Sequence, residues 1–124
     1  MRPGIALYGG SPVAGRASPV EPVVCLRLPI IQLRQLEAGD TVGYGACYRA
    51  PSRRWMATVW GGYADGLPRN LSFRGRGLCE GTLVPVVGRV SMDTCVFDVT
   101  DVESELLEER DVIEVLGVHL TIDD

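Results

Sequence analysis

The sequence has 124 residues, of which 46 % are hydrophobic and 23 % charged, and its formal net charge is −4. A chain of this length predicts one globular domain that buries about two-thirds of its unfolded surface. All 12 basic residues are arginines scattered along the chain, which disfavours a nucleic-acid partner. No apolar run approaches the roughly 20 residues of a membrane helix, and no signal-peptide pattern opens the chain, so we expect a cytoplasmic protein with no membrane partner.

The chain opens with a short apolar segment, residues 2–8, which runs into a stretch rich in glycine, proline and serine, residues 9–22. Such a stretch is typical of a linker or surface loop. From Val23 onward, short apolar runs alternate with turn sequences, and helix-length amphipathic periodicity is nearly missing. This alternation predicts an all-β domain.

The first long apolar run changes phase part-way along its length. Leu28 and Ile30 share one face of an extended strand, whereas Ile31 and Leu33 continue the apolar set on the other face. Because successive side chains of a strand point to opposite faces, this change predicts a bulge or bend near residues 29–31. A curved sheet or small barrel is the expected result.

Further strands are predicted at residues 41–48, 55–60, 84–90, 94–99 and 112–116, with a weaker one at 118–122. The acidic stretch at residues 103–111 is more typical of a solvated connection than of a turn of helix, since it joins two short strands. The sequence Arg74-Gly75-Arg76-Gly77 predicts a turn.

The cysteines are widely spaced, and none forms a C-x-x-C pair or lies close in sequence to the single histidine, His119. This spacing predicts no metal site, and it predicts reduced, mostly buried side chains at all four positions. The four are Cys25, Cys47, Cys79 and Cys95. We expect His119 to be a surface or strand residue without a chemical role.

Three short motifs combine glycine with a polar or aromatic side chain. They are Gly43-Tyr44-Gly45-Ala46, Gly62-Tyr63-Ala64-Asp65-Gly66 and Gly88-Arg89-Val90-Ser91-Met92-Asp93. Glycine on both sides of a tyrosine removes neighbouring bulk, so that a ligand can approach the phenol closely. Each motif alone is also common at ordinary bulges and turns.

Taken in order, the motifs resemble those of one family, alanine racemase. The resemblance begins with Arg2-Pro3-Gly4-Ile5-Ala6-Leu7-Tyr8-Gly9 and Val42-Gly43-Tyr44-Gly45-Ala46. It continues with the Gly62–Gly66 motif followed by Pro68-Arg69, and with Pro85-Val86-Val87 leading into the Gly88–Asp93 motif. It implies a C-terminal β domain at residues 21–124, without the family's last segment, preceded at residues 1–20 by a linker and the end of an N-terminal (β/α)8 barrel.

The same resemblance implies a homodimeric enzyme that interconverts L-alanine and D-alanine, for peptidoglycan, with pyridoxal 5'-phosphate. One subunit's barrel would carry the cofactor on a lysine, and the C-terminal domain of the other subunit would close the site. The present sequence contains no lysine, so covalent attachment of the cofactor within this chain is impossible. The isolated chain is therefore expected to be inactive.

Specific roles follow for four residues of the motifs. The resemblance implies that Tyr44 is a catalytic base opposite the cofactor lysine, because racemisation removes a proton from one face of the α-carbon and returns one to the other. Tyr63 would line the substrate entrance. The backbone N–H of Met92 would bind the substrate carboxylate, and Asp93 would lie beside it. A phenol titrates near pH ~10, so Tyr44 needs cationic or hydrogen-bonding neighbours, which the family places on the barrel.

The first motif would contact the cofactor. The resemblance implies that Arg2 directs its guanidinium at the pyridine nitrogen, and that Gly4 and Ile5 offer backbone N–H groups to the phosphate. Since a guanidinium cannot accept a proton, Arg2 would keep that nitrogen unprotonated and so disfavour side reactions such as transamination.

Several alternatives stay open. Tyr44 is also compatible with an ordinary strand tyrosine, Tyr63 with a turn residue, Asp93 with a partner of a nearby arginine such as Arg89, and Arg2 with a disordered terminus. For the whole chain, the alternatives are a racemase of serine or lysine, a β-barrel that binds RNA through residues 74–77, and a purely structural dimerisation domain.

Overall fold

The longest strand, β1 (Leu26–Leu36), pairs with two different partners along its length. Its first half pairs with β8 (Val112–Leu116) and its second half with β4 (Arg54–Trp60), both antiparallel. The register shifts between Ile30 and Gln32, which confirms the predicted bulge. Because the bulge bends the strand, β1 can serve both halves of a curved sheet.

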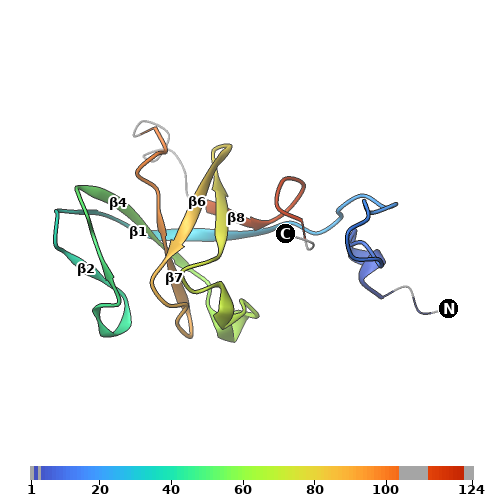
Figure 1. The fold of residues 1–124 in the computed structure, drawn as a ribbon, viewed down its shortest axis with the longest axis horizontal. Helices are drawn as coiled ribbons and strands as arrows, with labels where there is room; N and C mark the ends of the chain where they lie inside the picture. The colour runs from blue at the N-terminus through green and yellow to red at the C-terminus, as the bar shows by residue number, and fades with distance from the viewer. Residues whose placement is uncertain (1, 3, 104–111, 122–124) are drawn as a thin grey trace.

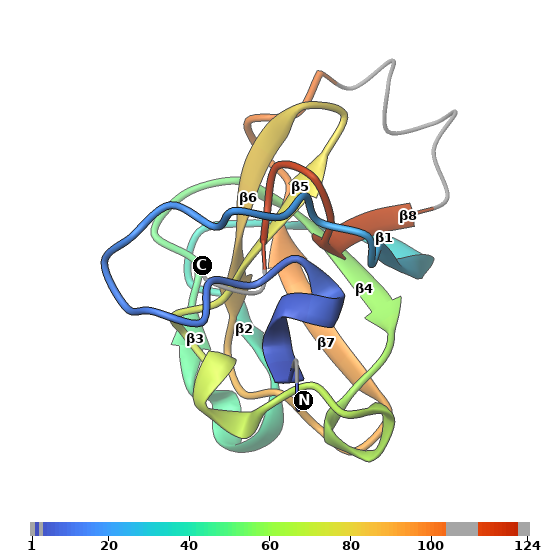
Figure 2. The same ribbon diagram turned by 90° about the vertical axis from the view of Figure 1, so that its right-hand side faces the viewer.

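The computed structural model, which describes residues 2, 4–103 and 112–121, closes this sheet into a barrel. The strand order is β1-β4-β7-β6-β5-β8, where β5 is Arg76–Cys79, β6 is Thr82–Val87 and β7 is Thr94–Asp98. Every neighbouring pair is antiparallel. Figures 1 and 2 show the strands wrapped around a common interior. The predicted all-β class and small barrel are confirmed.

Two apolar clusters fill the fold. The larger lies inside the barrel and includes Val59, Val84, Phe97 and Ile113, all almost fully buried. The smaller consists of Leu36, Ala50, Met56 and Val87, with Val42, Tyr48 and Val96 packed against it. The smaller cluster therefore fixes the short hairpin of β2 (Thr41–Val42) and β3 (Tyr48–Arg49) against the barrel wall.

The single strand predicted at residues 41–48 is wrong. The chain leaves β2, makes a 3-10 turn, η2 (Tyr44–Ala46), and returns as β3. Gly43, Gly45 and Ala46 all have positive φ values, of 82°, 72° and 50°. A strand cannot continue through such angles, and glycine adopts them without steric cost. The motif is thus a hairpin tip rather than a strand interior.

Other predicted boundaries need correction. The strand expected at 84–90 ends at Val87, because Gly88 turns the chain with a φ of 75°. No strand forms at 118–121, the described part of the weaker candidate, where the Gly117 N–H donates to the Leu120 carbonyl in a turn. The strands predicted at 55–60, 94–99 and 112–116 are confirmed to within one residue. The expected connection at 103–111 lies outside the described residues, apart from residue 103.

Strand β5 was missed, since residues 74–77 were expected to form a turn. Arg76 and Gly77 instead pair with β6, and only Arg74 lies in a turn. A Cβ atom on Gly77 would lie 2.5 Å from Ile113 Cγ2 and 2.9 Å from Phe97 Cε1. Glycine is therefore needed here for close packing of the barrel interior, and not for a turn.

The N-terminal segment lies apart from the barrel strands. A 3-10 helix, η1 (Gly4–Tyr8), is followed by irregular chain up to β1, as predicted for residues 9–22. Figure 1 shows η1 in dark blue beyond one end of the barrel, and Figure 2 looks from that side. The division at residue 20 stays a prediction. No helix among the described residues is long and apolar enough to cross a membrane.

No disulfide bond joins any of the four cysteines, all of which lie among the described residues. Cys79 and Cys95 are buried, as expected, because they point into the barrel interior. Cys25 and Cys47 are exposed, so the prediction of mostly buried thiols holds for only half of them. Both exposed residues lie just outside a strand, where alternation no longer directs a side chain inward.

Candidate functional site

The Gly62–Gly66 motif forms a tight turn at the end of β4. Tyr63–Asp65 make the 3-10 turn η3, and a carboxylate oxygen of Asp65 accepts a hydrogen bond from the Gly62 N–H at 3.0 Å. Gly66 ends the turn with a φ of 98°, an angle that favours glycine. The two glycines of the motif thus shape the turn that presents Tyr63.

This turn is hydrogen-bonded to the Gly88–Asp93 motif. The N–H groups of Tyr63 and Ala64 donate to the carbonyl oxygens of Ser91 and Met92, each at 3.0 Å, and the Gly61 N–H donates to the Asp93 carbonyl at 2.8 Å. The approach is close enough that a Cβ on Gly62 would lie 2.3 Å from both the Ser91 and the Met92 carbonyl oxygens. Three residues predicted to share a site, at positions 63, 92 and 93, are therefore brought together.

Met92 and Asp93 lie at the tip of a reverse turn. Ser91 closes it: its hydroxyl donates to the Thr94 carbonyl at 2.7 Å and accepts from the Thr94 N–H at 3.2 Å. The Met92 side chain is 53 % exposed, and Asp93 is exposed too. Within the part of the chain that the structure describes, the Met92 N–H donates to no protein acceptor. This N–H group is therefore without a protein partner within the described chain.

Two arginines border the hollow beside this tip. The hollow has a volume of about 640 Å³, and the guanidinium of Arg69, from the turn η4 (Arg69–Leu71), lies 4.4 Å from the centre of the Tyr63 ring. The lining residues are Tyr63, Arg69, Arg89, Val90, Ser91, Met92, Asp93 and Thr94. The ion pairs among the described residues do not include Arg89 with Asp93.

The hairpin that carries Tyr44 lies beside the same segment. A Cβ on Gly43 would lie 3.9 Å from the Arg89 nitrogen and from the Gly88 Cα. A second hollow, lined by Gly43, Arg89, Ser91, Thr94, Cys95 and Val96, shares three residues with the first. The backbone next to Tyr44 therefore borders a trough that runs past Arg89 to Tyr63.

The residues predicted to contact the cofactor do not join this trough. Arg2, Gly4 and Ile5 are exposed, and η1, which begins at Gly4, lies away from the barrel in Figure 1. Gly4 has a φ of 56°, and a Cβ there would meet nothing within 4 Å. A single site that includes both this segment and the trough would therefore require another domain or subunit between them.

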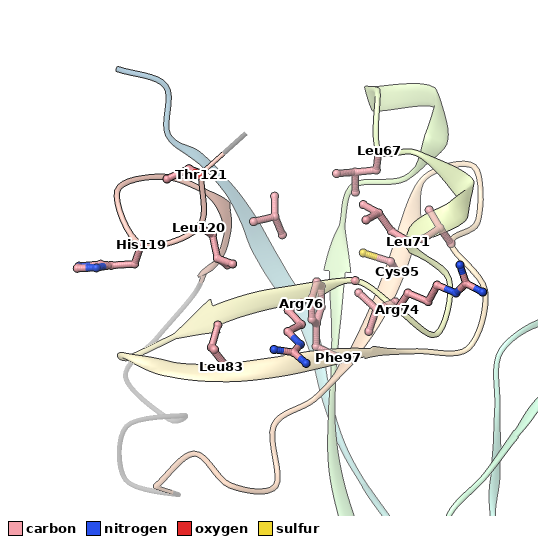
Figure 3. A pocket seen from close by; sticks show the side chains of 14 residues that line it. Leu67, Leu71, Arg74, Arg76, Leu83, Cys95, Phe97, His119, Leu120 and Thr121 are labelled. Carbon is pink, nitrogen blue, oxygen red and sulfur yellow. The ribbon is translucent and has the colours of Figure 1, made fainter. Parts of the chain in front are cut away.

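A third hollow, of about 480 Å³, lies on another part of the barrel. Figure 3 shows Leu120 on one side and Leu67, Leu71 and Cys95 on the other. His119 is among the lining residues, but it is exposed and its ring points outward, as expected for a surface histidine. No group of three or more histidine, cysteine or acidic residues able to hold a metal ion occurs among the described residues.

Sequence reasoning gave no site role to Arg69, Ser91 or Thr94, although all three line the trough. Arg69 follows the Gly62–Gly66 motif by three residues, and the resemblance implies no role for it. Its spacing alone gave no signal, because its position over Tyr63 depends on the turn η4. Ser91 and Thr94 are hydrogen-bonded to each other across a turn, and the strand pattern of the sequence does not predict that turn.

Fold and trough together define a small antiparallel barrel domain with an open, arginine-bordered site at the ends of its strands. Comparison with known families gives this class a name. Residues 23–124 match the family model described as alanine racemase, C-terminal domain. The chain belongs to this family.

Individual relatives support the assignment to this family. The chain is 49 % identical over 122 residues to the alanine racemase of Rhodospirillum rubrum, covering 98 % of this chain and 33 % of that protein. The structure of alanine racemase from Acinetobacter baumannii superposes with a TM-score of 0.86 at 40 % identity, covering 98 % of this chain and 34 % of that one. The Bartonella henselae enzyme, described with covalently bound pyridoxal phosphate, gives a TM-score of 0.83 at 35 % identity, covering 95 % and 33 %. The chain thus spans about one third of the length of these relatives.

Proposed function

We propose that this chain is the C-terminal domain of an alanine racemase, in which it completes the active site of a partner subunit and supplies Tyr44 as a catalytic base. The observation that carries the proposal is the trough, where Tyr63, Met92 and Asp93 meet beside the hairpin of Tyr44. The reaction would interconvert L-alanine and D-alanine and so provide D-alanine for peptidoglycan.

The residues of the chain fit pyridoxal phosphate only in part. Arg2 and the backbone N–H groups of Gly4 and Ile5 are donors of the kind that bind anionic and aromatic nitrogen groups, and Arg2 is exposed. The lysine that would hold the group covalently is missing from the sequence. When bound, pyridoxal phosphate withdraws electrons from the α-carbon of an amino acid and so makes its proton more acidic. The covalent attachment must come from a barrel domain.

The chain's own residues would then bind and orient the substrate. The Met92 N–H, which the described structure leaves without a protein acceptor, would donate to the substrate carboxylate. Arg69 and Arg89 would attract that anion to the hollow, and Tyr63 and Asp93 would border its path. Tyr44 would exchange a proton with the α-carbon on the face opposite the lysine.

The partners of the domain would be the (β/α)8 barrel of its own chain and the barrel of a second subunit in a homodimer. The open trough supports this arrangement, since Met92 and Asp93 are exposed rather than covered by other parts of the described chain. A site that requires one domain from each subunit needs the dimer for activity.

Complementation in trans tests the proposal. This chain is mixed with a separately produced barrel domain of the same racemase, and conversion of L-alanine to D-alanine is measured, with L-serine and L-lysine as competing substrates. We expect racemisation of alanine from the mixture and none from either part. A Tyr44→Phe chain is the matched control and should not restore activity. Preferred turnover of serine or lysine, or equal rescue by the control, would contradict the proposal.

A further inference from the structure

Ser72 lies at the end of η4, outside the set of residues with a predicted role, and its hydroxyl makes two hydrogen bonds. It donates to the Arg69 carbonyl oxygen at 2.6 Å and accepts from the Val90 N–H at 2.9 Å. A hydroxyl is a donor and an acceptor on one atom, so this short side chain can join two backbone segments at once.

Both joined segments line the hollow. Arg69 carries its guanidinium over the Tyr63 ring, and Val90 leads directly into Ser91, Met92 and Asp93. One further hydrogen bond runs between the same segments, from the Phe73 N–H to the Gly88 carbonyl at 3.1 Å. That second link uses only backbone atoms, so substitution of Ser72 leaves it in place.

The buried residue Val90 depends on the Ser72 hydroxyl for the hydrogen bond of its N–H group. Val90 is only 4 % exposed, and a backbone N–H that loses its partner in such surroundings is unfavourable. Without the hydroxyl, a new protein partner for this N–H requires movement of the Val90 segment relative to η4. Such a movement changes the spacing between Arg69 and the turn that carries Met92.

We propose that Ser72 is a positioning residue that sets the spacing of these two lining segments and, through it, the affinity of the site for an amino-acid carboxylate. The effect on affinity rests on the proposed function. Among the described residues, Ser72 makes no hydrogen bond to the hairpin of Tyr44, which packs mainly on the separate cluster of Leu36, Ala50, Met56 and Val87. We therefore expect loss of the hydroxyl to act on KM more than on the proton-transfer step.

Nuclear magnetic resonance tests the positioning itself, independently of activity. In Ser72→Ala, hydrogen exchange of the Val90 amide is expected to become at least about tenfold faster. The upfield ring-current shift that Tyr63 imposes on the Arg69 side-chain protons should shrink. Ser72→Thr keeps the hydroxyl and both signatures. Ser52→Ala, an exposed serine before β4, is the matched control and should change neither.

Kinetics of the racemase that contains this domain test the consequence. We expect Ser72→Ala to raise KM for alanine about fivefold while kcat changes less than about twofold, with Ser72→Thr close to the parent. Unchanged Val90 exchange and Arg69 shifts in Ser72→Ala overturn the proposal, as does a fall in kcat at constant KM. A parent enzyme without racemase activity overturns the proposed function instead, and the resonance data then decide the positioning role alone.

Discussion

The guanidinium carbon of Arg69 lies 4.4 Å from the centre of the Tyr63 ring, in the geometry of a cation–π contact. The two residues belong to successive 3-10 turns, η3 and η4, and both line the hollow beside Met92. The contact holds a positive charge at the edge of the hollow while leaving the guanidinium exposed to an incoming anion. This combination suits recognition of a carboxylate.

Replacement of Arg69 should therefore weaken both stability and substrate affinity. For Arg69→Met we expect the free energy of unfolding of the chain to fall by about 0.5–1 kcal/mol, the range of an exposed cation–π contact, as measured by urea titration. KM of the racemase for alanine should rise. Arg34→Met, an exposed arginine on β1, is the control and should change neither quantity. Equal effects of the two substitutions would show that the ring contact is not stabilising.

Gly62 is expected to be the least replaceable glycine of the site. An alanine Cβ at this position would lie 2.3 Å from two carbonyl oxygens, and relief would separate the Tyr63 turn from the Met92 turn. We expect Gly62→Ala to lower the free energy of unfolding by about 3 kcal/mol, the upper end of ordinary overpacking costs, in urea titrations.

Gly81→Ala is the matched control for this substitution. Gly81 has a φ of 77°, but a Cβ there would meet nothing within 4 Å, so its cost is backbone strain of about 1 kcal/mol. If Gly62→Ala costs no more than Gly81→Ala, the packing of the two turns is looser than the hydrogen bonds between them indicate.

The sequence predicted the barrel well where alternation decided the outcome. The phase change between Ile30 and Ile31 predicted the bulge, and the bulge appears as a register shift in the pairing of β1 with β4. Strand β5 was missed because Gly77 faces the interior and contributes no apolar side chain to the pattern. Ile113 and Phe97 pack against Gly77 instead. Such contacts between residues distant in sequence are not visible in the local pattern of apolar side chains.

The grouping of Tyr63, Met92 and Asp93 was expected from a family resemblance, and residue types alone could not have given it. The grouping depends on three backbone hydrogen bonds between turns almost thirty residues apart. Position 44 was assigned to a strand because Tyr and Val favour strands, whereas the positive φ angles of Gly43 and Gly45 make it a hairpin tip. The roles proposed for Tyr44, Arg2, Gly4 and Ile5 stay predictions.

Tyr44→Phe tests the role of the phenol in the racemase that contains this domain. Removal of a general acid–base group costs about 10²–10⁴ in rate, so racemisation in both directions should fall by that factor. Exchange of the α-deuterium with solvent should persist for one enantiomer of alanine only, because the lysine still acts on its own face. Tyr48→Phe, in β3, should retain activity within about threefold. Equal loss of exchange for both enantiomers would show that Tyr44 does not act on one face alone.

Cys95 gives the fold a pH dependence that can be checked without any enzyme assay. Burial in the barrel interior raises the pKa of its thiol from an ordinary value of 9.0 to about 12. The folded state therefore keeps its proton between pH 9 and 12 while the unfolded chain releases it. Since the unfolded state then binds fewer protons, stability falls as pH rises through this window, by up to about 1.4 kcal/mol per pH unit.

Urea titrations between pH 8 and 11 should accordingly show a steeper loss of stability in the parent chain than in Cys95→Ala, so that the difference between them changes with pH. Val59→Ala removes a buried side chain paired with Cys95 across β4 and β7, but it removes no titrating group. Its cost relative to the parent should be the same at every pH. Parallel stability curves for the parent and Cys95→Ala would mean that the thiol reaches water in the folded state, and that the barrel interior is more open at β7 than its packing indicates.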